Sequence, residues 1–139
     1  MILLDTNVLS AMMHGGIYPA VVKWLDAQPG ESVWTSAISV FEVRFGLEIM
    51  AKGRRRRALE DAFAKTLSED LENRVLPFDS TAAEAAAIIA AHQRSIGRPV
   101  EIRDVQIAGI AAARKAVLAT RNSRHFEDIG ISVTNPWTD

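Results

Sequence analysis

Four polar residues interrupt apolar stretches of the chain at places where their side chains could do chemistry. Asp5 ends the run MILLD, Glu42 lies in SVFEVRFGL, Asp104 in EIRDVQIAGIAA and Asn122 in VLATRNSRHF. Asp5 and Asn122 each follow a run typical of a short buried strand, and Asp104 falls in the first turn of an expected helix. In open α/β sheets, ligands bind at the carboxyl ends of the strands. We therefore expect these residues to gather at one edge of a sheet.

Three carboxylates held close together repel one another, which raises their pKa values or forces their neutralisation. A divalent cation removes that cost. Oxygen ligands favour Mg²⁺ or Mn²⁺ over Zn²⁺, and the chain contains no cysteine. Such a metal can bind a phosphate oxygen, activate a water and stabilise the leaving oxygen of a phosphodiester. The residue types thus indicate metal-dependent hydrolysis.

Each of the four residues also has a purely structural interpretation. Asp5 could cap the helix that follows it, and Glu42 stands at capping-box spacing from Ser39. Asp104 could favour a helix N-terminus through the macrodipole, and Asn122 could be a turn residue. A shared site accounts for all four positions with one cause, whereas the structural interpretations require four separate ones.

Length and composition limit the class of protein. The 139 residues suit a single domain spanning residues 1–139. No apolar stretch approaches the roughly 18 residues of a membrane span, and no signal peptide opens the chain, so we expect a soluble cytoplasmic protein. Because 16 basic residues face 17 acidic ones, a nucleic acid would have to be held by a local patch or a bound cation.

The elements expected around these residues alternate between strand and helix. Strands are predicted at Ile2–Leu4, Ser32–Trp34, Arg74–Leu76, Val117–Ala119 and Ile131–Thr134. Helices are predicted from Val8 to Met13, around Val21–Leu25, from a cap at Thr35–Ser36 to Ala51, at Ala58–Leu71, from a capping box at Thr81–Glu84 to Gly97, and at Ile102–Arg114. This alternation implies an α/β fold with parallel strands covered by helices.

The basic run Arg54–Arg57 connects two of the predicted helices, which together suggest an αα-hairpin. A run of four arginines is usually a solvated helix face. Docking of RNA or of a partner protein is the alternative interpretation.

The motifs resemble those of PIN-domain ribonucleases, particularly the VapC and FitB toxins of type II toxin–antitoxin modules. The matching segments are MILLDTNVLS, TSAISVFEVRFGL, RDVQIAGIAA, ATRNSRHF and VTNPW, which together span nearly the whole chain. The resemblance implies a five-stranded parallel sheet of order 3-2-1-4-5 with helices on both faces. It also implies a Mg²⁺- or Mn²⁺-dependent endoribonuclease acting on RNA such as tRNA. The implied partners are a small antitoxin, which blocks the site and can bind operator DNA, and a second copy of the chain in a homodimer.

The resemblance assigns roles by position. Asp5, Glu42 and Asp104 take the catalytic and metal-binding roles, and the hydroxyls of Thr6 and Thr120 are placed to orient carboxylates or water. The chain departs from many members at one catalytic position, where Asn122 replaces a fourth acid. With three carboxylates instead of four, we expect one well-occupied metal ion in the free protein.

Three further residues are candidates for contact with RNA phosphate. Arg103 stands where many family members have a small residue, and it could contact phosphate or point outward. His125 could contact the scissile phosphate or could pack beside Phe126 on the surface. Arg121, next to Asn122, is the third candidate.

Two other functions remain open from the sequence. Asp5 could be the nucleophile of a phosphohydrolase, although that chemistry usually needs an acid two positions on, where this chain has Asn7. Alternatively, the chain could be an inactive PIN-like binding module. Buried carboxylates retained without a metal would be destabilising, which argues against the binding module.

Overall fold

A computed structural model describes residues 1–139, and five parallel strands form the sheet at its centre. The strands are β1 (Ile2–Leu4), β2 (Val33–Ser36), β3 (Val75–Leu76), β4 (Val117–Ala119) and β5 (Val133–Thr134). Their order is β3-β2-β1-β4-β5, and every neighbouring pair is parallel. The predicted α/β fold and strand order are confirmed. The direction of winding reverses between β1 and β4, which is where an open sheet of this type forms its ligand crevice.

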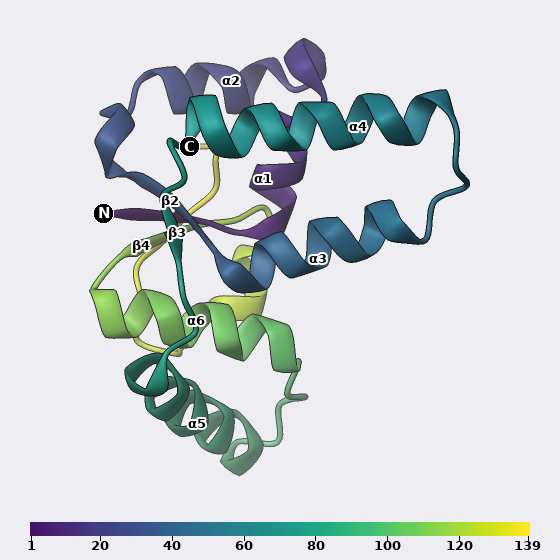
Figure 1. Cartoon of the computed structure of the whole chain (residues 1–139). Helices are drawn as coiled ribbons and strands as arrows, with labels where there is room; N and C mark the ends of the chain where they lie inside the picture. Colours follow the sequence, from purple (N-terminus) through teal and green to yellow (C-terminus); the bar gives the residue numbers. More distant parts are fainter.

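Six α-helices connect the strands, as Figure 1 shows. They are α1 (Thr6–Met12), α2 (Pro19–Asp26), α3 (Ala37–Glu48), α4 (Arg54–Lys65), α5 (Ser80–Ser95) and α6 (Ile102–Arg114). Short helical turns at Gly15–Ile17 (η1), Gly30–Ser32 (η2), Thr66–Asp70 (η3) and Ser123–Phe126 (η4) complete the connections. None of the helices has the length and apolar character needed to cross a membrane.

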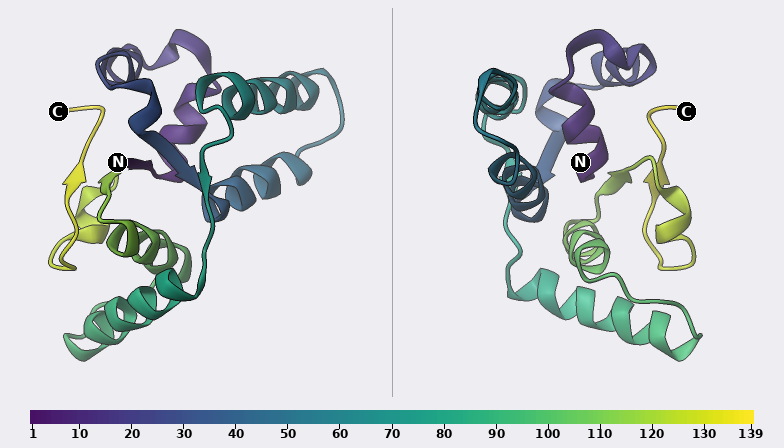
Figure 2. Two further views of the ribbon diagram at one scale, coloured as in Figure 1. Left: turned by 60° about the vertical axis from the view of Figure 1, so that its left-hand side comes forward. Right: turned by 90° about the vertical axis from the view of Figure 1, so that its right-hand side faces the viewer.

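The sheet has a separate apolar core on each face. Successive side chains of a strand point to opposite faces, so Leu3 joins the core under α5 and α6, whereas Leu4 joins the core under α1 to α4. Leu118 and Ala119 of β4 divide between the two cores in the same way. Figure 2 shows the two groups of helices on either side of the strands. The predicted covering of both faces is confirmed.

Side-chain caps fix where several helices begin. Ser36 caps α3 by accepting a hydrogen bond from the Ser39 backbone N–H at 3.1 Å. Helix α5 begins at Ser80, and Asp79 caps it by accepting from the backbone N–H of Ala82 at 3.0 Å. The predicted capping box starting at Thr81 is therefore wrong, because the carboxylate of Asp79 satisfies the helix terminus two residues earlier.

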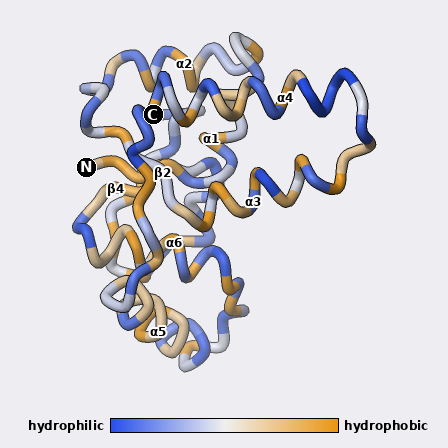
Figure 3. Tube along the Cα trace, viewed as in Figure 1, coloured by the Kyte–Doolittle hydropathy of each residue, from blue (hydrophilic) through white to orange (hydrophobic).

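The arginine run lies within α4, which starts at Arg54 and not at Ala58 as the sequence predicted. Positive charge at a helix N-terminus is unfavourable, but Arg56 pairs with Glu48 of α3 and Glu60 of α4 and donates to the Glu48 and Met50 carbonyls. These contacts offset the cost and join the two helices. The other three arginines are exposed, and the start of α4 is strongly hydrophilic in Figure 3.

Helices α5 and α6 approach each other closely at Gly109. A Cβ added at Gly109 would lie 2.5 Å from the Ala82 carbonyl oxygen and 2.7 Å from the Cβ of Ala86. The absence of a side chain at Gly109 therefore sets the distance between the two helices. This packing positions the start of α6, which carries Asp104.

We expect Gly109→Ala to lower the free energy of unfolding by about 1–3 kcal/mol, because the added methyl overpacks this contact. Urea unfolding of both proteins measures the difference. Gly46→Ala is the matched control, since nothing lies within 4 Å of a Cβ at that position of α3. The control should gain about 0.5–1 kcal/mol from replacement of a helical glycine. Equal effects of the two substitutions would contradict the close packing.

Candidate functional site

The candidate site lies at the carboxyl edge of the sheet, between β1 and β4. Asp5 directly follows β1, and Thr120 directly follows β4. The backbone N–H of Asp5 donates to the Ala119 carbonyl at 2.9 Å, so the two strand ends are held side by side. The reversal of winding described above therefore coincides with the first of the candidate acids.

Asp5 is only 5% exposed, and each of its carboxylate oxygens accepts one hydrogen bond. Oδ1 accepts from the Thr6 backbone N–H at 2.8 Å, and Oδ2 accepts from the Thr120 hydroxyl at 2.7 Å. Burial raises the pKa of Asp5, and the charge of Asp104 raises it further, against the opposing effect of the two hydrogen bonds and of His125. Asp5 caps α1, as its structural interpretation proposed, and still lies among the candidate acids.

Glu42 reaches the same edge from α3. Its Oε1 accepts a hydrogen bond from the Thr6 hydroxyl at 2.8 Å, and that hydroxyl also lies 2.9 Å from the hydroxyl of Ser39. The capping-box interpretation of Glu42 is wrong, because Ser36 and not Ser39 caps α3. Thr6 thus links the start of α1 to a carboxylate 36 residues later in the chain.

Asp104 is half-buried in the first turn of α6, and its Oδ2 lies 3.0 Å from Nδ1 of His125. Burial raises the pKa of Asp104, with smaller increases from the charges of Glu101 and Glu42, and His125 acts in the opposite direction. The charge of Glu42 thus raises the pKa of Asp104, and the charge of Asp104 raises the pKa of Asp5. The fold brings the three acids predicted from the sequence to the same edge of the sheet, where the charge of Asp104 interacts with the other two.

A family model described as the PIN domain matches residues 2–131 of this chain. The chain belongs to the PIN-domain family. Plasmid stability protein StbB of Pseudomonas syringae pv. tomato is 42% identical over 137 residues, which cover 99% of each chain. VapC ribonuclease Y4jK of Sinorhizobium fredii is 39% identical over 137 residues, or 99% of this chain and 98% of the relative.

A solved structure of FitAB bound to a DNA fragment has a TM-score of 0.89 and 33% sequence identity to this PIN domain. The match covers 100% of this chain and 97% of that one. The resemblance to PIN-domain toxins inferred from the sequence motifs is confirmed.

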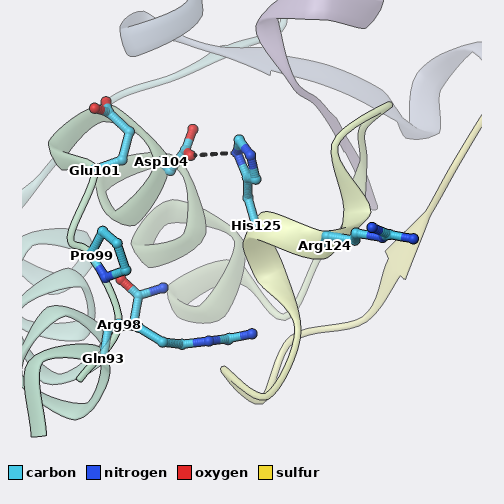
Figure 4. A pocket seen from close by; sticks show the side chains of 7 residues that line it. All are labelled: Gln93, Arg98, Pro99, Glu101, Asp104, Arg124 and His125. Carbon is cyan, nitrogen blue, oxygen red and sulfur yellow. Dashed lines mark hydrogen bonds and ion pairs between the residues drawn. The ribbon is translucent and has the colours of Figure 1, made fainter. Parts of the chain in front are cut away.

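Two of the candidates for phosphate contact, Arg103 and His125, contact the acids of the PIN domain directly. Arg103 is exposed and also reaches the acids: its Nη1 lies 3.5 Å from Oε2 of Glu42, and its Nε lies 3.8 Å from Oε1 of Glu101. His125 is exposed, and its ring centroid lies 6.4 Å from that of Phe126, as its structural interpretation proposed. Its Nδ1 also lies 3.0 Å from Oδ2 of Asp104 (Figure 4), a contact that the sequence did not predict. Contact of either residue with phosphate stays a prediction.

Arg121 and Asn122 are exposed and lie at the margin of the site. The Arg121 guanidinium stacks over the Trp137 ring at 4.9 Å from its centroid. The Asn122 backbone N–H donates to the Thr120 hydroxyl at 3.0 Å, and its carbonyl accepts from the His125 N–H in the η4 turn. Asn122 therefore has the turn position of its structural interpretation, and its catalytic role stays a prediction.

Asn7 and Ser39 contact the site residues but were not predicted from the sequence as part of the site. The Asn7 side-chain amide donates to the Thr120 hydroxyl at 3.4 Å, and its oxygen accepts from the Arg121 backbone N–H at 3.2 Å. This places Asn7 as a tie between the ends of β1 and β4. The available signal for Asn7 was its position in the LDTN segment, two residues after Asp5.

The donor set of the site suits a hard divalent cation. Asp5 has no lysine or arginine partner, and burial raises the pKa values of both Asp5 and Asp104. No three acidic or histidine side chains are close enough together to hold a metal in the present arrangement. Arg103 contacts Oε2 of Glu42, and His125 contacts Oδ2 of Asp104. Binding of a cation by all three acids would require their side chains to move closer together.

The raised pKa of Asp5 predicts how stability depends on pH. Between the unfolded and folded pKa values the folded protein binds more protons, so its free energy of unfolding falls as pH rises through that window. Asp5→Asn removes the charge whose burial is costly at neutral pH. We therefore expect the free energy of unfolding of Asp5→Asn, relative to that of wild type, to be higher at pH 7 than at pH 3. Urea unfolding at both pH values, with no divalent metal present, measures this difference.

Asparagine also changes the hydrogen bonds at position 5. The part of that effect that is the same at both pH values drops out when the two differences in free energy of unfolding are compared. Asp26→Asn, at the exposed end of α2, provides a control for a general charge effect. If the free energy of unfolding of Asp5→Asn relative to wild type is the same at pH 7 and pH 3, burial does not disfavour the charge of Asp5.

Proposed function

We propose that this PIN domain is the ribonuclease toxin of a toxin–antitoxin module and hydrolyses RNA phosphodiester bonds with Mg²⁺ or Mn²⁺. The observation that carries the proposal is the buried carboxylate of Asp5, which lacks a cationic partner and lies beside Asp104 at the reversal point of the sheet. The relation to a protein named VapC ribonuclease supports the same activity.

Asp5, Glu42 and Asp104 would hold the cation, and the loss of an acid at Asn122 favours a single ion. When bound, the metal supplies Lewis-acid activation of water and stabilisation of the leaving oxygen. Thr120 and Thr6 fix Asp5 and Glu42 through hydrogen bonds of 2.7 and 2.8 Å, so the carboxylates are oriented before the metal arrives. Attack by water would leave a 5′-phosphate and a 3′-hydroxyl.

Local cations would compensate for the overall charge of −1 when RNA binds. Arg103, whose side chain is 47% exposed, is the cation that lies beside the acids. His125, whose side chain is 57% exposed, can add a hydrogen bond to phosphate. Transfer of Arg103 from Glu42 to an RNA phosphate would free the carboxylate for the metal and position the substrate at the same time.

The partner in the proposed module is a small antitoxin that inserts a basic side chain into the acidic site. The relative solved as FitAB bound to DNA supports a partner that also engages an operator. On α3, Phe41 and Phe45 stack with ring centroids 6.1 Å apart and are 58% and 52% exposed, which provides apolar surface for protein contact. A second copy of the chain, forming a homodimer, is also part of the proposal.

Antitoxin-free protein incubated with a broad RNA pool should cleave it in Mg²⁺ or Mn²⁺, and EDTA should stop the reaction. Asp5→Asn should abolish cleavage by removing a metal ligand. Thr120→Val should lower it roughly 10–100-fold, because the ligand stays but loses its orienting hydroxyl. Sequencing of the RNA ends measures cleavage and locates the cuts.

Asp26→Asn serves as the active control, and co-purification with the antitoxin should be unchanged in Asp5→Asn. Failure of the wild-type protein to cut any RNA with either metal would sink the ribonuclease and favour a binding module. Covalent labelling of Asp5 by a small phosphoryl donor would instead favour the phosphohydrolase.

A further inference from the structure

The turn between α3 and α4 carries a dense group of positive charges. Residues 52–57 contain five basic side chains and no acid, so this segment has a formal charge of +5. Because the whole chain carries −1, the rest of it carries −6. Figure 1 shows the turn at the outer end of the α3–α4 hairpin, away from the strands. The chain thus separates an exposed basic turn from a remainder that is acidic overall.

One arginine of the run holds the hairpin together. Arg56 is partly buried and pairs with Glu48 of α3 and Glu60 of α4. Arg44 pairs with the same two carboxylates. Residues 43–60 contain no other acid. The carboxylates nearest to the turn are therefore already paired with other arginines.

The other four cations of the turn form what we call the basic patch: Lys52, Arg54, Arg55 and Arg57. All four are exposed, and none of them forms an ion pair within the chain. The three arginines lie in the first turn of α4, so their like charges are close together and repel one another. The helix dipole disfavours positive charge at the same place. The basic patch therefore opposes folding, and a bound polyanion would relieve the repulsion.

We propose that the basic patch binds the sugar–phosphate backbone of the RNA substrate, away from the nucleotide that is cut; this inference rests on the proposed function. RNA fits the charges because it presents a row of phosphates, and arginine binds phosphate through two parallel hydrogen bonds. Residues 51–58 include no aromatic side chain on which a base could stack. The contacts are therefore to the backbone and do not depend on base sequence.

The proposed antitoxin fits the basic patch less well than RNA does. That partner needs positive charge of its own, both to enter the acidic site and to bind operator DNA. Positive charge on both proteins would be repulsive at this turn. RNA is also the partner that has to overcome the acidic remainder of the chain, so it gains most from a local group of cations.

Helix α3 connects the basic patch to the candidate acids. Glu42 lies six residues before Glu48, which places it about 9 Å along the helix axis from the end of α3. The basic patch begins at Lys52, four residues beyond that end. An RNA that contacts both places must extend beyond the nucleotide that is cut. The basic patch therefore contributes to the binding of RNA and not to the chemical step.

The salt dependence of RNA binding tests the proposal without relying on cleavage. The full chain is titrated with a hairpin RNA in EDTA at several salt concentrations. The patch variant, in which Arg54→Gln, Arg55→Gln and Arg57→Gln are combined, should bind at least about tenfold more weakly than wild type. The slope of log K against log salt should decrease in magnitude by about 2–3, because each lost phosphate contact removes roughly 0.7–0.9.

A matched control removes the same charge from other places. Lys23→Gln, Arg94→Gln and Lys115→Gln combined remove three exposed cations that lie in or next to three different helices. This variant should keep close to the wild-type affinity and salt slope. Arg56 stays in both variants, so the melting temperature of the patch variant should be no lower than that of wild type. Equal weakening by the two variants, or an unchanged salt slope in the patch variant, would overturn the proposal.

Cleavage of the hairpin RNA with metal present separates this inference from the proposed function. The patch variant should raise KM and leave kcat unchanged, because the basic patch does not touch the reacting atoms. If wild type cuts RNA and the patch variant keeps the wild-type KM, the basic patch is not an RNA site and the ribonuclease stands. If wild type cuts no RNA but the patch variant still loses affinity and salt slope, the RNA site stands and the ribonuclease is wrong. Loss of antitoxin co-purification with unchanged RNA binding would identify a protein contact instead and overturn the proposal.

Discussion

The burial of the Asp5 carboxylate is the constraint on which the rest of the site depends. An ionised group at 5% exposure, with a second acid nearby, costs several kcal/mol unless neighbouring groups compensate. The compensation comes from one backbone N–H and one hydroxyl, that of Thr120. Asn7 and Asn122 in turn donate to this hydroxyl, which directs its single proton to Asp5. Asp5 follows β1 and Thr120 follows β4, so the hydrogen bond between them forms only because these two strands are neighbours in the sheet. The strand order therefore determines how Asp5 is held.

Much of the fold could be predicted because local sequence determines its short strands. Apolar runs bounded by polar residues located Ile2–Leu4 and Val117–Ala119 at their observed limits. The errors occur where distant residues decide. The start of α4 depends on the pairing of Arg56 with Glu48 in another helix, and no local rule favours arginines in a first helical turn. Similarly, β5 is shorter than its apolar pattern because only Val133–Thr134 pairs with β4.

The sequence identified the acids of the site but not their contacts. Asp5, Glu42 and Asp104 stood out as charges in apolar surroundings, and the family motifs added Thr6 and Thr120. Whether Arg103 faces Glu42 or solvent depends on how α3 packs against α6, which sequence spacing does not encode. The same holds for the basic patch. The sequence showed the arginine run, but which of its members stay unpaired depends on the contacts of Arg56 with Glu48 and Glu60, which lie in two different helices.

The hydrogen bond between Asp5 and Thr120 joins residues that are 115 positions apart. At a synthesis rate of roughly 5–20 residues per second, Thr120 is added roughly 6 to 23 s after Asp5. A growing chain therefore has its first acid long before the hydroxyl that orients it, and Asp104 is also added late. Incomplete chains released from the ribosome would lack an assembled site, so a cell making this protein is exposed to its chemistry only once translation is nearly finished.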